Sequence, residues 1–252
     1  MKTFMTIFII LILSIYYVPA DINEKLYDAI EQEDLGQINE LISLGADLNY
    51  RDNNGWTPLM WAVLNNRGIN VVSLLLDHKT DIHKKDPFKM SVILWAAAFN
   101  NHLDVMEFLL QKGAKLEDRD KDEWTPLMKA LRYNDEKMIG YLINRGADIQ
   151  AVTERTSLLT PLMIALANNR DIKIIQLLID LGSNVNQADN WWKTPLMWAA
   201  MYHQDPNVIK LLIDSGADVN WRSYNKQNAL DYAMEHNKNK KVILVLEKAI
   251  KQ

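Results

Sequence analysis

The sequence predicts an all-α solenoid, a stack of about seven helix pairs joined by β-turn loops that we call fingers. The first observation is a repeated word, because GWTPLMWAV at 55–63 returns as EWTPLMKAL, LTPLMIAL and KTPLMWAA. The second is its spacing of 34 or 35 residues, which also includes a copy with Ser and one with Asn in the Thr place. The third is a second word, GADLN at 45–49, which recurs in nearly constant phase with the first. The Thr places are Thr57, Ser91, Thr125, Thr160, Thr194 and Asn228.

Residues 1–20 are typical of an export signal peptide. Lys2 is the only charged residue there, an apolar run follows it, and Val18-Pro19-Ala20 suits a cleavage site before Asp21. The apolar run is shorter than the roughly 20 residues of a membrane-spanning helix, so we expect cleavage, with a retained signal anchor as the alternative. This predicts an exported protein, periplasmic or extracellular, with no stable membrane insertion after cleavage.

The two ends of the array have the polar character of capping repeats. Residues 21–50 contain two helix patterns without Thr-Pro-Leu, and the first of them carries a charged face. Residues 221–252 form the other cap, which is rich in Lys. A solenoid needs polar terminal units to stay soluble, because their outer faces have no neighbour.

Five central repeats fill residues 51–220, and each predicts two short helices. In the repeat at 55–83, Thr57 is a good N-cap and Pro58 suits the first helical position. NNRG at 65–68 ends this first helix. In most repeats a Gly closes the second helix. The second helix has apolar residues at helical spacing, namely Val71, Val72, Leu74, Leu75 and Leu76. One such unit cannot bury its own apolar face, so the units are stable only when stacked.

These motifs together resemble the ankyrin repeat family. The resemblance rests on Thr-Pro-Leu-x-x-Ala, the Val/Ile/Leu-rich second helix and Gly-Ala-Asp-Val-Asn, and it covers roughly residues 22–248. It implies paired antiparallel helices with outward fingers in a curved array. This chain departs from the family in carrying Met where the family usually has His after Thr-Pro-Leu. It also has a two-residue insertion in the finger at 151–158.

The sequence contains no recognisable catalytic constellation. There is no Cys, which excludes disulfides and thiol chemistry, and a net charge of −4 argues against a nucleic-acid partner. The run of alternating Asp at 118–122 lacks the later Gly and Glu of a calcium loop, so we interpret it as a solvated finger. We expect no enzyme activity, no catalytic residue, no metal and no cofactor; an enzyme with an unrecognised site built across repeats is the alternative. We expect surface or loop positions for the five histidines, His78, His83, His102, His203 and His236.

Aromatic residues are the best candidates for function. Trp61, Trp95 and Trp198 share one place inside the first helix, and we assign them to the core. Trp56 and Trp124 share the place just before the Thr, where other repeats carry residues as different as Lys and Gln. In arrays that resemble this one, that place faces a concave groove, as does the end of the first helix. The predicted protein-binding residues are Trp56, Phe88, Met90, Phe99, Trp124, Tyr133, Leu159, Trp191, Tyr202 and Tyr224. The alternative is that some of these rings only pack onto a neighbouring finger.

Taken together, these features predict an exported, monomeric protein without catalytic activity that binds another protein through its concave groove. The fold does not fix the function, so the kind of partner stays open. The alternative is a secreted effector or inhibitor that blocks a host or competitor protein.

Overall fold

The structure, a computed structural model, describes residues 20–251. The predicted signal peptide therefore lies outside the described residues, apart from Ala20. No helix within the described range has the length and apolar character needed to cross a membrane. That range also contains no strand, and its one isolated β-bridge, between Lys85 and Ser91, is antiparallel.

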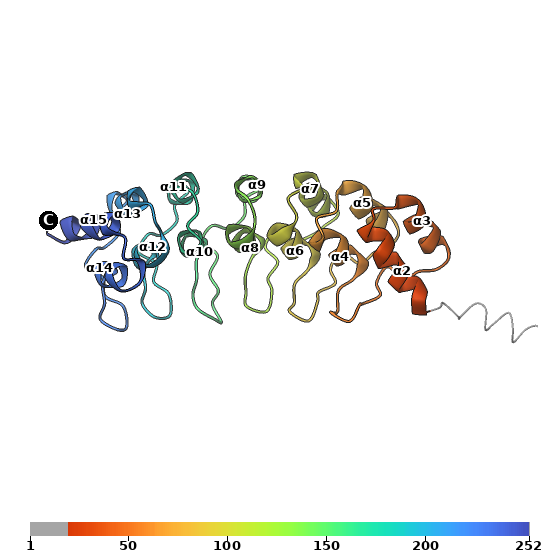
Figure 1. Ribbon diagram of the computed structural model, residues 1–252, viewed down its shortest axis with the longest axis horizontal. Coiled ribbons are helices and arrows are strands. Elements are labelled where there is room, and N and C mark those ends of the chain that lie inside the picture. The colour runs from red at the N-terminus through yellow and green to blue at the C-terminus, as the bar shows by residue number, and fades with distance from the viewer. Residues whose placement is uncertain (1–19, 252) are drawn as a thin grey trace, which may run out of the picture.

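Residues 20–251 form seven helix pairs in a row, which confirms the predicted all-α solenoid (Figure 1). The inner helices are α2 (Ala20–Glu31), α4 (Pro58–Leu64), α6 (Val92–Phe99), α8 (Pro126–Tyr133), α10 (Pro161–Ala167), α12 (Pro195–Tyr202) and α14 (Ala229–Tyr232), the last continued by the π-helix η1 (Ala233–Asn237). The outer helices are α3 (Leu35–Ser43), α5 (Ile69–Asp77), α7 (Leu103–Gln111), α9 (Glu136–Asn144), α11 (Ile172–Asp180), α13 (Pro206–Asp214) and α15 (Lys240–Ile250). In Figure 1 the outer row lies above the inner row, and the fingers extend below it.

The repeated Thr place is the N-cap of every inner helix from α4 to α14. The hydroxyls of Thr57, Thr125 and Thr160 each accept the backbone N–H three residues on, at 3.3 Å. Asn228 forms a full capping box with Asp231. An N-cap acceptor satisfies one of the N–H groups that a helix start leaves unpaired. The repeated word is therefore a start signal for each inner helix.

The glycine of the second word closes the outer helices. Gly113, with φ +98, donates its N–H to the Leu110 carbonyl oxygen, while Ala114 donates to Leu109. This is the left-handed closure for which Gly is preferred, and four further repeats share it. Lys79 takes the same place after α5 at φ +61, so a residue with a side chain adopts the glycine conformation there.

One apolar core runs through the whole array. Inner helices approach each other at a fully buried alanine in successive repeats, which lets their backbones pack closely. From α5 the core receives Val71, Val72 and Leu75, whereas Leu74 and Leu76 are only partly buried. The methionines that replace the usual His are buried core residues as well. They are Met60, Met128, Met163 and Met197.

Replacing Leu109 with Ala should lower the free energy of unfolding by about 2–5 kcal/mol, because this fully buried side chain lies in the continuous core. The matched control is Leu181→Ala, since Leu181 is 50% exposed at the end of α11. Urea unfolding followed by circular dichroism would measure both. Equal loss of stability in the two variants would contradict the assignment of the core.

Candidate protein-binding groove

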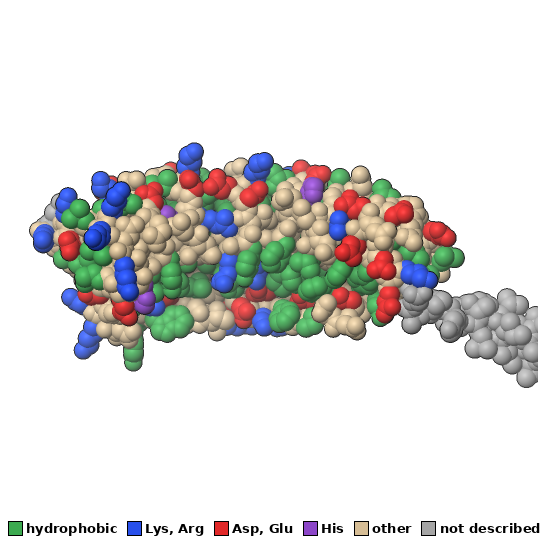
Figure 2. Space-filling model, viewed as in Figure 1, with side chains coloured by type: hydrophobic (Ala, Val, Ile, Leu, Met, Phe, Trp, Pro, Cys, Tyr) green, Lys and Arg blue, Asp and Glu red, His purple; other side chains and the backbone are tan. Residues whose placement is uncertain are grey.

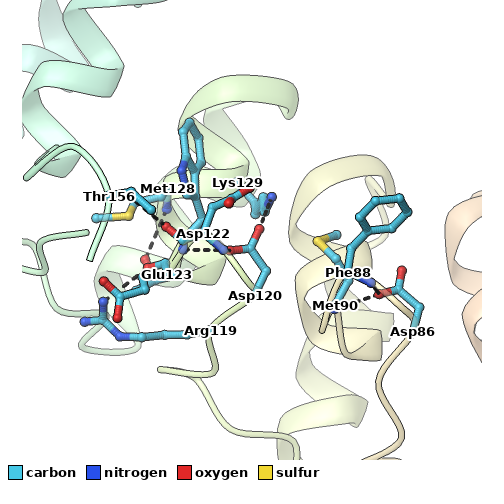
Figure 3. Close-up of polar contacts among 12 residues, drawn as sticks. Asp86, Phe88, Met90, Arg119, Asp120, Asp122, Glu123, Met128, Lys129 and Thr156 are labelled. Atoms are coloured by element: carbon cyan, nitrogen blue, oxygen red, sulfur yellow. Dashed lines mark hydrogen bonds and ion pairs between the residues drawn. The ribbon is translucent and has the colours of Figure 1, made fainter. Parts of the chain in front are cut away.

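An aspartate side chain fixes the shape of four fingers. In the finger before α8, Oδ1 of Asp120 accepts the backbone N–H groups of Asp122 and Trp124, both at 2.9 Å (Figure 3). Asp86 accepts the corresponding two N–H groups in the finger before α6, at 2.8 and 2.9 Å (Figure 3). Asp52 and Asp189 do the same in theirs. In each of these four fingers, the second of the two bonds holds the residue that precedes the Thr place.

The structure corrects the interpretation of residues 118–122 as a solvated finger. Asp120 is 7% exposed, and its Oδ2 forms an ion pair with Lys129 Nζ at 2.6 Å. Its negative charge is used inside the protein, by backbone N–H groups and by Lys129. Within residues 20–251, no group of His, Asp and Glu is arranged to hold a metal ion.

In two fingers the other carboxylate oxygen of the aspartate, Oδ2, bonds the inner-helix side chain that lies nine positions later in the sequence. Trp198 Nε1 donates to Asp189 Oδ2 at 3.1 Å, as Lys129 does to Asp120. In the last repeat, Tyr232 Oη donates to Ser223 Oγ at 3.0 Å. In these three repeats the inner helix is tied to its own finger by this donor, whereas Trp61 Nε1 and Trp95 Nε1 at the same place have no hydrogen-bond partner among the described residues. This contact was not predicted from the sequence, although an Asp five residues before the Thr place recurs with the same period in four repeats.

A row of aromatic rings crosses the first four repeats. Neighbouring ring centroids lie 5.4–5.9 Å apart along the whole row. The rings, in order, are Tyr27, Trp61, Trp56, Trp95, Phe99 and Tyr133. Figure 2 shows a band of apolar side chains that runs between the inner helices and the fingers on the face in view.

This row corrects the predicted division between core and surface tryptophans. Trp61 was assigned to the core and Trp56 to the surface, yet the two rings touch and both are half-buried. Trp95 and Trp198 are half-buried too. Both tryptophan places thus contribute to folding and to the edge of the same surface.

The predicted binding residues fall into three groups by exposure. Those whose side chains are open to a partner are Phe88, Phe99, Tyr133, Trp191, Tyr202 and Tyr224. Trp56, Trp124 and Leu159 are half-buried. Met90 is 6% exposed, so its prediction as a surface contact needs correction, because the finger bond to Asp86 turns this residue inward. We call the exposed and half-buried members together the groove.

A cavity of about 250 Å³ opens on the groove between the fingers that precede α6 and α8. Its apolar walls are Phe88, Met90, Trp95, Ala98, Phe99 and Tyr133. Two exposed charged residues, Lys121 and Asp122, line it with the ion-paired Asp120 and Lys129. The aromatic row and the finger contacts thus meet at one hollow in the surface.

Cations lie over the rings of the groove. Lys121 Nζ is 4.5 Å from the centroid of Phe88. The Arg132 guanidinium is 5.3 Å from the Tyr133 ring and 5.5 Å from the Trp124 ring. Lys193 Nζ lies 5.3–5.9 Å from three rings, those of Trp191, Trp198 and Tyr232. Such cation–π contacts are worth about 0.5–1 kcal/mol each at exposed sites.

His203 lies in the loop after α12, as expected for the histidines, but it is buried there. It is 3% exposed, and its Nε2 lies 2.9 Å from the Arg170 carbonyl oxygen. The Asp205 N–H donates to Nδ1 at 3.3 Å, which fits Nε2 as the donor to Arg170. Asn100 and Asn134 hold the preceding repeat from the corresponding place, which makes this a joint between units.

The comparisons with known proteins agree on the architecture. A family model for ankyrin repeats matches three times, over residues 18–86, 69–153 and 162–252. The ankyrin repeat domain of human ASB11 is similar in fold, with a TM-score of 0.76 at 24% identity over 89% of this chain and 96% of that one. The ankyrin repeat domain of Bcl-3, a member of the IkappaB protein family, has a TM-score of 0.68 at 27% identity, over 88% of this chain and 97% of its own. No curated protein sequence matches the chain.

Asp120→Ala should destabilise the protein by about 2–4 kcal/mol, because two finger N–H groups and the partly buried Lys129 lose their partner. Asp122→Ala is the matched control, since Asp122 is exposed and its carboxylate forms no ion pair with the described residues. Thermal unfolding of both variants would test this. A finger aspartate that is only solvated would give two unchanged melting temperatures.

Proposed function

Because the chain belongs to the ankyrin repeat family, we propose that it binds another protein through the groove and performs no catalysis itself. Ankyrin repeats are generally modules of protein–protein interaction, and their stacked units create long continuous binding surfaces. The observation that carries the proposal is the set of large apolar side chains that remain exposed on one surface beside a cavity.

Variation between repeats supports this surface as the place of recognition. Stacking requires the same buried alanine in each inner helix, whereas the residue before the Thr changes from Trp56 to Leu159 and Lys193. The end of the inner helix likewise carries Phe99 or Tyr133 at an exposed position. Aromatic residues at the centre of an interface supply much of the binding energy, and contiguous exposed apolar surface is typical of interaction sites.

We further propose that the protein is exported, so that its partner lies in the periplasm or outside the cell. The support is the pattern of residues 1–20, in which Lys2, the apolar run and Val18-Pro19-Ala20 match a cleaved signal. The helix α2 begins at Ala20, so cleavage before Asp21 would leave the first cap nearly complete.

The double variant Phe99→Ala with Tyr133→Ala should weaken binding to a captured partner by at least ~2 kcal/mol, as expected for aromatic hot spots. Both side chains are more than two-fifths exposed, so the melting temperature should change little. Affinity capture from the native fraction, followed by calorimetry with the purified partner, measures the loss. Leu44→Ala, an exposed residue at the end of α3, is the control. Unchanged binding by the double variant would remove the groove from the proposal.

Intact-mass measurement of the native protein should give a chain that begins at Asp21. The reason is that signal peptidase cuts after small residues such as Ala20. A chain that retains Met1 in the membrane fraction would argue for a signal anchor, and the proposal of a released protein would then fail.

A further inference from the structure

Three cations on the groove lie over aromatic rings and form no ion pair with the described residues. Lys121, Arg132 and Lys193 each lie within 6 Å of at least one aromatic centroid. None of them forms an ion pair with any residue in the range 20–251. The ring attracts the cation without neutralising it, so the full positive charge stays available to a partner.

Cations between outer helices behave differently. Lys112 pairs with Asp77 at 3.1 Å, and Arg145 pairs with Glu107 at 2.6 Å. Each of these pairs joins two neighbouring repeats, so the charges serve the stacking of the array. Lys121, Arg132 and Lys193 have no such structural partner in the described part of the chain, which distinguishes them from these cations and from Lys129 in the cavity wall.

The carboxylates near the groove do not offset these cations at the surface. Asp86, Asp120 and Asp189 are buried, and the Oδ1 atom of each accepts backbone N–H groups of its own finger. Asp122 is the exposed acid at the cavity, and Glu235 near the C-terminal end accepts a hydrogen bond from Gln227. The groove therefore presents a positive surface on a protein whose net charge is −4.

The cavity lies among these charges. Lys121 is part of its lining, and Arg132 stacks over the Tyr133 ring that forms another wall. Its volume of about 250 Å³ exceeds the ~150 Å³ of an apolar cavity that holds benzene, so it can take a side chain the size of Phe or Leu. Apolar walls with a positive rim favour an apolar side chain that has acidic neighbours.

We infer that the groove binds an extended acidic segment of its partner, with one bulky apolar side chain in the cavity and flanking carboxylates on Lys121, Arg132 and Lys193. The inference rests on the proposed binding function and specifies the chemistry of the partner. Charge steers the segment to the groove, and burial of the apolar side chain holds it there.

Four fluorescent probes and the intact mature chain test this by anisotropy. The first is a peptide of roughly 12 residues, at most ~40 Å when extended, in which Phe and Leu alternate with Asp and Glu. The second has Lys at every acidic place, and the third has Ala at every apolar place. The fourth is a single-stranded oligouridine of similar length, because cations and rings are also the signature of single-stranded nucleic-acid sites.

The acidic apolar peptide should bind at least about tenfold more tightly than any other probe, and more weakly as salt is raised from ~0.05 to ~0.5 M. Lys121→Glu combined with Arg132→Glu should lower this affinity by a further factor of about ten or more. Both side chains are exposed, and the backbone bond from Lys121 to Phe88 remains, so folding should be unaffected. Lys137→Glu, a single charge reversal on the outer helix α9, should leave binding unchanged.

The inference is overturned by equal affinity for the acidic and basic peptides, by tighter binding of oligouridine, or by no saturable binding of the acidic peptide up to about 1 mM. It is also overturned if the alanine peptide binds equally, because the cavity would then play no part. A captured protein partner that still depends on Phe99 and Tyr133 would in these cases preserve the proposed function alone. Loss of that dependence would remove both.

Discussion

The burial of small and aliphatic side chains between neighbouring repeats is the interaction on which the rest of the structure depends. The inner helices from α4 to α12 have 7 or 8 residues, a length at which an isolated helix is unstable in water. Fully buried alanines such as Ala96 and Ala130 let one inner helix pack closely on the next. Each unit therefore gains its stability from its neighbours, and the inner helices and fingers stay at a fixed spacing along the array.

Polar contacts with the stacked inner helices fix the positions of the fingers. A buried finger aspartate such as Asp120 bonds both its own loop and a donor on the inner helix, so the loop cannot swing independently. Side chains at the base and tip of the finger, among them Trp124 and Phe88, are thereby set against the inner helices. Because these contacts already hold the loops in one conformation, the protein loses less conformational entropy when a partner binds. The pre-arranged groove, with its cavity and its cations, is the functional consequence.

The local features of the fold were predictable from the sequence because they repeat with the period of the units. The caps at Thr57 and its equivalents, the closing glycines and the seven helix pairs all follow from spacing and residue type. Predictions were wrong where a side chain meets another repeat or its own finger. The touching rings of Trp56 and Trp61 and the inward turn of Met90 depend on how side chains pack within one repeat and its finger. A period alone does not specify that packing. The predicted binding residues are a different case, because their exposure is compatible with recognition and only a partner can test it.

Photo-crosslinking tests the groove as the binding surface most directly, since it reports which side of the array faces the partner. A photoreactive phenylalanine analogue would be placed at Tyr133 on α8 and, in a second protein, at Lys137 on α9 of the same helix pair. Both positions are exposed, so the two proteins differ mainly in the side that carries the probe. We predict a crosslink to the partner from position 133 and none from position 137. A crosslink from position 137 alone would place the partner on the outer helices and contradict the groove as the binding surface.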